Sequence, residues 1–218
     1  PYHVPALELL GRLLMLQQNW VQARRCYRNL LDQQPRHTEA RFQMGQIEMH
    51  EGYGSCAVKA FERALESAPG RTDIQWALAE ALMKESRYTE SLAVLQPLMQ
   101  TDTENSRVFA LAGAVYNIQG HREAALECYE KAYRLQPDHC EVLTELAALQ
   151  HELGHYLDAA LSYQQLLKYD NSPPMQHNLA NVYYQTGEIG ECRVILERLI
   201  REHGKVHEPE WKMSYTLL

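Results

Sequence analysis

The segment 117–138 reads NIQGHREAALECYEKAYRLQPD, and the segment 151–172 reads HELGHYLDAALSYQQLLKYDNS. The two segments align without a gap at an offset of 34 residues, with glycine, histidine, alanine and tyrosine in the same columns. The aligned pairs are Gly120 and Gly154, His121 and His155, Ala125 and Ala159, and Tyr129 and Tyr163. A fixed period of roughly 20–50 residues is typical of solenoids and other repeat arrays. The sequence therefore predicts a repeat architecture.

The same offset divides nearly the whole chain into six units. We predict units at 4–37, 38–71, 72–105, 106–139, 140–172 and 173–206, of which the fifth is one residue short. Positions within a unit are numbered below as slots, with slot 1 at Val4, Thr38, Thr72, Ser106, Cys140 and Pro173.

Small and large residues recur at fixed slots. Slot 8 holds only Gly or Ala, and slot 20 holds Ala, Ser or Cys, as two closely packed helices require. Slot 24 is large: Tyr27, Phe61, Leu95, Tyr129, Tyr163 and Leu196. Glycine recurs at slot 15, a residue that commonly ends a helix, and proline at slot 32, where it would stop a second helix. Each unit is therefore predicted to be a helix, a short turn and a second helix.

This pattern of small slots 8 and 20, an aromatic slot 24 and proline at slot 32 resembles the tetratricopeptide repeat (TPR) family. The resemblance covers residues 4–206. It implies an all-α, right-handed superhelical solenoid of helix-turn-helix repeats. It also implies a protein-protein interaction scaffold that binds a peptide or a partner subunit in its concave groove.

Composition and motifs narrow the function. The formal net charge is −7 and no Lys/Arg run follows the chain, which disfavours a nucleic acid or an anionic membrane as partner. No apolar stretch approaches the roughly 20 residues of a membrane-spanning helix. No phosphate-binding or nucleophile motif is present, so we expect no enzyme activity, no cofactor and no metal.

Residues 151–155, HELGH, match the H-E-x-x-H signature of zinc proteases, in which two histidines share one helical face. The repeat places His151 at slot 12, near the end of the first helix, and His155 in the following turn. The two histidines would then not share a face. We therefore interpret HELGH as part of the repeat.

The five cysteines form no C-x-x-C pair, and their odd number leaves at least one unpaired. Unpaired thiols favour a reducing compartment, so we expect a cytoplasmic location.

In the TPR family, slots 2, 5, 6, 9, 12 and 13 of the first helices line the groove, and the resemblance carries this role to the same slots here. In the first three units these slots supply apolar candidates for partner binding, with one acid: Met15, Phe42, Met49, Trp76, Glu80 and Met83. Methionine and tryptophan are common at protein interfaces. The alternative is that these side chains only pack between neighbouring helices.

In the last two units the same slots are more polar. The candidates there are Glu145, His151, His177, Asn181 and Tyr184. Over all six units the groove slots hold seven acids and three bases, which favours a basic or polar peptide. A merely solvated helical face is the alternative.

Two other functions stay open. The chain could be the substrate-recognition region of a larger enzyme such as a protein glycosyltransferase, although the asparagine ladder of those repeats at slot 6 is reduced here to Asn178. Self-association through an exposed terminal repeat, giving a homo-oligomeric scaffold, is the other. A chaperone-type carboxylate clamp is disfavoured, because its lysine and asparagine set is missing.

Residues 207–218, HEPEWKMSYTLL, resemble the start of another first helix. We expect them to begin a seventh unit or to form a capping helix. Since the chain also lacks an initiator methionine, we expect the parent protein to be longer.

Overall fold

The computed structural model describes residues 3–203, which form twelve α-helices and no strand. The helices are α1 (Val4–Leu16), α2 (Trp20–Gln33), α3 (Thr38–His50), α4 (Gly54–Ser67), α5 (Thr72–Lys84), α6 (Tyr88–Thr101), α7 (Ser106–Ile118), α8 (Arg122–Leu135), α9 (Cys140–Glu152), α10 (Tyr156–Leu166), α11 (Pro173–Thr186) and α12 (Ile189–His203). Odd-numbered helices are called A helices below and even-numbered helices B helices. The predicted seventh unit or capping helix at 207–218 lies outside the described residues.

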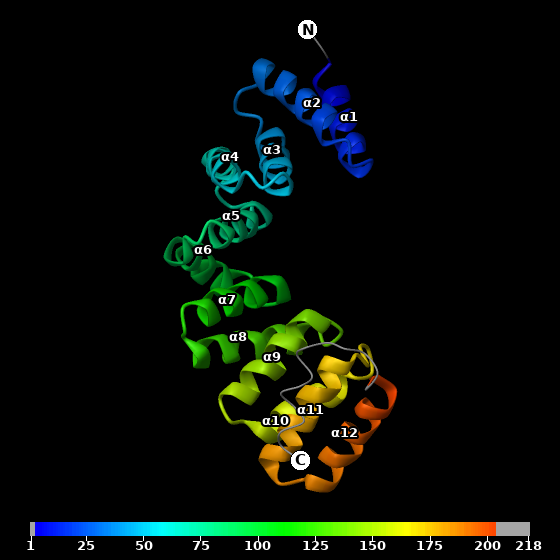
Figure 1. The fold of residues 1–218 in the computed structure, drawn as a ribbon. Coiled ribbons are helices and arrows are strands. Elements are labelled where there is room, and N and C mark those ends of the chain that lie inside the picture. The colour runs from blue at the N-terminus through cyan, green and yellow to red at the C-terminus, as the bar shows by residue number, and fades with distance from the viewer. Residues whose placement is uncertain (1–2, 204–218) are drawn as a thin grey trace. The chain divides into compact units, whose positions relative to one another are not determined.

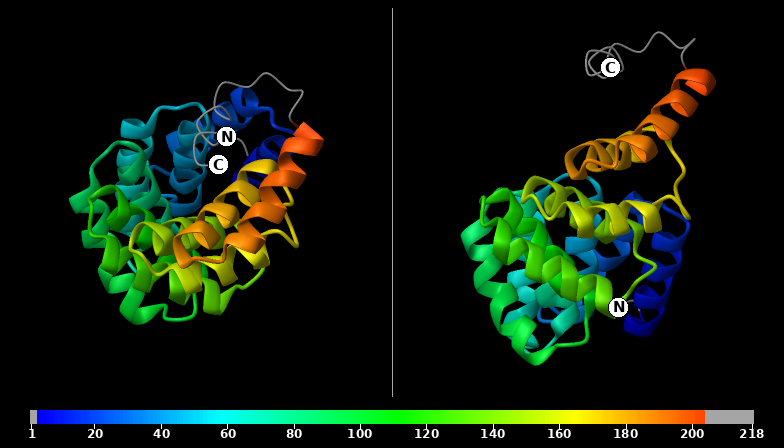
Figure 2. Two further views of the ribbon diagram at one scale, coloured as in Figure 1. Left: turned by 60° about the horizontal axis from the view of Figure 1, so that its bottom comes forward. Right: turned by 90° about the horizontal axis from the view of Figure 1, so that it is seen from below.

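The chain forms two compact units, residues 1–121 and 122–218. The first unit contains α1–α7 and the second contains α8–α12. Within the first unit α1, α3 and α5 each pack beside the B helix that follows, as α3 and α4 show clearly in Figure 1. In the second unit α11 and α12 form the last such pair, drawn in yellow and orange in Figure 2.

The turn from each A helix to its B helix has the same geometry in all six repeats. The residue at slot 15 is left-handed each time, with φ between +58° and +81°. Four of these residues are glycines, and Gln18 and Ser86 adopt the same conformation despite their side chains. The next residue then donates its backbone N–H five residues back, as Tyr53 does to the Glu48 carbonyl at 2.8 Å. This Schellman motif satisfies carbonyls that a helix end would otherwise leave unpaired.

Slot 8 is small because slot 24 lies directly against it. A Cβ added at Gly11 would lie 2.7 Å from the Tyr27 ring, and one at Gly45 would clash with the Phe61 ring. Both rings are fully buried. At slot 20 of the third repeat, Ser91 replaces alanine, and its buried hydroxyl donates to the Ala79 carbonyl at 2.8 Å. The small slots thus allow the two helices of a pair to approach closely.

The A helices also pack against the B helix that precedes them, through slot 10. Ile47, Ala81, Val115, Leu149 and Val182 occupy this slot, and each is at most 2% exposed. In α1 the same slot holds Leu13, which is 48% exposed. Slot 10 therefore contributes fully to the core only where a B helix covers it.

Truncating slot 10 should consequently cost different amounts in different repeats. We expect Leu149→Ala to destabilise its repeat by about 2–4 kcal/mol, the usual cost of a buried Leu→Ala change. Leu13→Ala should cost less than about 1 kcal/mol because half of that side chain is already in water. Amide hydrogen exchange in α9–α10 and in α1–α2 measures both values locally. Equal losses would show that Leu13 is as well covered as Leu149.

Candidate functional site

The predicted partner-binding residues of the first unit lie on the A-helix face, defined here as slots 2, 5, 6, 9, 12 and 13 of the A helices. Phe42 and Met49 come from α3 and Trp76 comes from α5. All three are half-buried and pack against one core cluster that includes Phe61 and Ile74. The structure thus brings these three side chains together around a shared core, and each keeps part of its surface in solvent.

Arg71, in the loop between α4 and α5, lies over Phe42. The Arg71 guanidinium is 5.6 Å from the Phe42 ring centroid, a cation–π distance. Arg71 also pairs with Glu39 at 3.2 Å and with Asp73 at 2.6 Å, and both acids occupy slot 2. The hydrogen bond from Arg71 is the main reason that the pKa of Asp73 lies below its ordinary value. Two of the seven groove acids are therefore already compensated within the chain.

Trp76 is engaged in the same way by the next repeat. The Arg107 guanidinium lies 3.9 Å from the Trp76 ring centroid, and the indole N–H donates to the Arg107 carbonyl at 3.2 Å. One arginine therefore covers a face of the indole and also satisfies its polar atom. Trp76 therefore does pack against the next repeat. Its side chain is half-buried, so part of it remains exposed to solvent.

The other three candidates of this unit lie apart from that cluster or are engaged elsewhere. Met15 packs against the core cluster formed by α1, α2 and α3, as does Trp20. The Trp20 ring stacks on that of His50, with 4.0 Å between the ring centroids. Glu80 pairs with Lys84 at 3.0 Å along α5. Met83 is half-buried near the end of α5.

The candidates of the second unit lie on α9 and α11. Glu145 is exposed, while His151 is half-buried with its ring 5.8 Å from that of Tyr156. On α11, His177 and Asn181 are half-buried and Tyr184 is 45% exposed. Burial lowers the pKa of His177, which favours its neutral form. This face is polar and accessible.

The two histidines of HELGH belong to different elements. α9 ends at Glu152, Gly154 is left-handed with φ +79°, and His155 is the N-cap of α10. Zinc chemistry of the H-E-x-x-H type needs both histidines on one helix. Among the residues that the structure describes, no group of three or more His, Cys, Asp or Glu side chains could hold a metal ion.

Within residues 3–203, no helix is long and apolar enough to cross a membrane.

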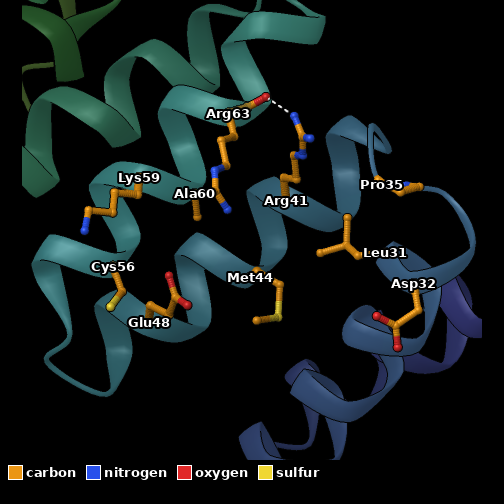
Figure 3. Close-up of a pocket in the computed structure, with 10 residues that line it drawn as sticks. All are labelled: Leu31, Asp32, Pro35, Arg41, Met44, Glu48, Cys56, Lys59, Ala60 and Arg63. Atoms are coloured by element: carbon orange, nitrogen blue, oxygen red, sulfur yellow. Dashed lines mark hydrogen bonds between the residues drawn. The ribbon is translucent and has the colours of Figure 1, made fainter.

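Two features of the structure were missed by the sequence analysis. His37 at slot 34 accepts the Ala40 N–H at 3.2 Å on Nδ1 and so caps α3, as His139 caps α9. Histidine is not among the usual N-cap residues, so the residue type at slot 34 did not indicate a helix cap. The second feature is a pocket of about 460 Å³ between α2, α3 and α4 (Figure 3). Its lining residues come from slots outside the A-helix face.

Pairs of antiparallel helices that repeat every 34 residues, each joined by a left-handed turn, define a helical-repeat protein. A family model described as the TPR domain of cytochrome c-type biogenesis protein H matches residues 26–135, half of the chain. Further tetratricopeptide repeat models match residues 6–39, 119–175 and 174–198. The chain belongs to the tetratricopeptide repeat family.

Known relatives share this repeat with the chain. A probable UDP-N-acetylglucosamine–peptide N-acetylglucosaminyltransferase, SPINDLY of Arabidopsis thaliana, is 29% identical over 94 residues, which are 43% of this chain and 10% of that protein. The chain spans a tenth or less of the first curated relatives that it matches.

Solved structures show the same fold. PilF of Pseudomonas aeruginosa superposes with a TM-score of 0.80 at 20% identity, covering 97% of both chains. YrrB, described as a TPR protein with an unusual peptide-binding site, gives a TM-score of 0.65 at 15% identity, covering 78% of this chain and 87% of its own. The fold is thus an all-α TPR solenoid.

The contact between Arg107 and Trp76 predicts a change in tryptophan fluorescence. In a Trp20→Phe/Trp211→Phe background Trp76 is the remaining tryptophan, and Arg107→Ala should make its indole more accessible to acrylamide. The same change should cost about 0.5–1 kcal/mol of stability, as for an exposed cation–π contact. Arg193→Ala, on α12, is the control. Unchanged quenching in Arg107→Ala would show that the guanidinium does not cover the ring in solution.

The partly buried carboxyl group of Glu48, in the pocket of Figure 3, should make the stability of the protein depend on pH. Burial raises the pKa of Glu48; the field of Arg24 opposes this rise and that of Glu51 adds to it. The folded state therefore holds the proton more tightly than the unfolded state. Stability from this group is complete below about pH 4.3, the ordinary Glu pKa, and is lost as the pH rises through the folded pKa.

Glu48→Gln should remove that loss, so the difference in melting temperature between the variant and the wild type should grow in favour of the variant between about pH 4 and pH 7. The exposed Glu62→Gln on α4 is the matched control and should show no such trend. A constant difference across this range for Glu48→Gln would contradict the raised pKa.

Proposed function

We propose that the chain is a protein-interaction scaffold whose A-helix face binds a peptide segment of a partner protein. The observation that carries this proposal is the set formed by Phe42, Met49 and Trp76. These side chains come from successive A helices, share one core and remain partly exposed. An apolar surface of this kind, held on rigid helices, suits the anchor residues of a partner.

The chemistry of the face favours apolar side chains at its centre. Arg71 and Arg107 hold Phe42 and Trp76 in place, so a ligand would lose little of its binding energy to ordering these rings. YrrB, which shares the fold, is described as having a peptide-binding site, and this description supports the class of ligand.

The second unit is proposed to contact a basic or polar segment of the same partner. Glu145 is exposed on α9, and Asn181 and Tyr184 offer polar groups on α11. By contrast, Glu152 is paired with Arg122 at 3.3 Å. Exposed carboxylates contribute more to the choice of partner than to affinity.

A second candidate function is substrate recognition within a larger enzyme. The likeness to SPINDLY, named as a probable peptide N-acetylglucosaminyltransferase, favours it. Under this alternative an adjoining domain would transfer N-acetylglucosamine to the bound peptides, whereas a scaffold would return its partner unmodified. Mass spectrometry of a bound peptide after incubation with the full-length parent protein distinguishes the two.

The A-helix face can be tested with peptides selected from a random display library on the immobilised chain. Their affinity for the wild type and for Trp76→Glu/Met83→Glu is measured by fluorescence anisotropy. We expect the double variant to bind at least about tenfold more weakly, since a central anchor is worth more than 1 kcal/mol. Circular dichroism verifies the fold of each variant.

The matched control is Leu157→Glu/Leu161→Glu, which changes two exposed leucines of α10 (71% and 61%) and should leave affinity unchanged. The contradicting result is a double variant that stays folded and still binds every selected peptide as tightly as the wild type. The A-helix face would then not be the binding site.

A further inference from the structure

The pocket between α2, α3 and α4 lies away from the A-helix face. Its floor comes from Arg41, Met44 and Glu48 of α3, none of which occupies a slot assigned to that face. One side comes from the end of α2 and the following loop, and the other from α4 (Figure 3). Leu31, Met44 and Ala60 make much of the lining apolar. A ligand here would therefore not compete directly with one on the A-helix face.

Glu48 is the unusual group in this pocket. Its side chain is half-buried, and its Oε2 atom is buried without a hydrogen-bond partner. A buried carboxylate oxygen that is left unpaired costs free energy, more than a neutral group does. Native structures seldom leave such a group without a partner or a function.

A comparison of slots 11 and 23 with the same slots of the fifth repeat shows that Glu48 lacks a hydrogen-bond donor. A second pocket, between α8, α9 and α10, is lined by Leu146, Gln150 and Ser162, at slots 7, 11 and 23. There, the Ser162 hydroxyl donates to Gln150 Oε1 at 2.7 Å, so the polar group of slot 11 is satisfied inside the repeat. In the second repeat, slot 11 is Glu48 and slot 23 is Ala60, which offers no donor. The change from an amide to a carboxylate thus coincides with the loss of its internal donor.

The charged groups around Glu48 are largely occupied or peripheral. From α2, Arg24 is bound by Glu51, and Asp32 adds a second carboxylate to the lining. On α3, Arg41 donates to the Arg63 carbonyl and lies 3.9 Å from Glu66.

On α4, Lys59 and Arg63 line the opposite side, and Figure 3 shows the Lys59 side chain extending away from Glu48. The pocket therefore has an acidic floor with two basic side chains at its α4 edge.

We propose that this pocket is a second docking site, which takes a basic side chain, lysine or arginine, of a partner protein. The alkyl stem would lie along Leu31 and Met44, and the charged end would donate to the Glu48 carboxylate. Lys59 and Arg63 then favour an acidic residue next to the inserted base. An acidic side chain entering the pocket would instead meet Glu48 and Asp32, and an apolar one would leave the carboxylate unpaired.

The probe is the tetrapeptide Ac-Ala-Lys-Glu-Ala-NH2, compared with the same peptide carrying norleucine in place of lysine. Norleucine keeps the alkyl stem and removes the ammonium group. Binding is followed by NMR of the ¹³C-labelled methyl group of Met44 and the carboxyl carbon of Glu48. We expect the lysine peptide to shift both signals and to lower the pKa of Glu48, because a cation stabilises the ionised carboxylate.

The expected specificity is a dissociation constant at least about tenfold lower for the lysine peptide than for the norleucine peptide, as for a hydrogen bond to a charged group. Glu48→Gln should abolish this preference, and Gln is already accommodated at slot 11 by the fifth repeat. The control Glu62→Gln should keep it. Trp76→Glu should keep it too, which separates this site from the proposed function of the A-helix face.

Three results would overturn the proposal. The two peptides could shift Met44 equally, or Glu48→Gln could bind the lysine peptide like the wild type. The free protein could also show a Glu48 pKa at or below the ordinary value, which would mean that Lys59 or Arg63 already pairs with the carboxylate in solution.

Discussion

The repeat depends on one close contact, between the small residue of slot 8 and the large residue of slot 24. In the second repeat the Phe61 ring lies against the backbone of Gly45, so no side chain can separate the two helices there. The left-handed residue at slot 15 reverses the chain so that this contact can form, and the resulting backbone hydrogen bonds satisfy the end of the A helix. With the pair fixed in this way, slot 10 is left to pack against the preceding B helix. Side chains outside these packed slots and the small slot 20 are then free to differ between repeats.

That freedom gives a single scaffold two kinds of surface. Groove slots of the A helices carry aromatic rings in the second and third repeats, and the arginine placed over each ring comes from the following loop or the next A helix. Slots 11 and 23 meet at the other side of the A helices. There, Gln150 and Ser162 form a closed pair, whereas Glu48 and Ala60 do not. The backbone geometry is the same in both repeats, so the difference lies in the side chains. A polar group that is paired within the repeat stabilises it, whereas an unpaired one can bind a ligand.

The period and the small and large slots were sufficient to predict the fold class, because they follow from steric rules that each repeat obeys separately. The conformation of Gln18 and Ser86 was harder to predict, since neither residue favours positive φ and only the repeat forces it. Residues of the candidate site could be placed on a face, but their partners could not. Arg107 reaches Trp76 across 31 positions, and nothing in a single sequence marks which slot-2 residue will stack on which slot-5 ring. The unpaired oxygen of Glu48 depends likewise on three helices at once.

The contact with Arg107 does not by itself prevent Trp76 from serving as an anchor for a partner peptide. A ring that is already held by a cation and by a backbone carbonyl has lost its rotamer freedom during folding, and so a ligand does not have to restrict it again. The same contact narrows what the ring can do, because one of its faces is taken. A partner must therefore approach the remaining surface of Trp76 together with Phe42 and Met49, whose common core fixes their spacing. Specificity on this face would then come from the fit to a preformed apolar surface, while the carboxylate of Glu48 selects by charge.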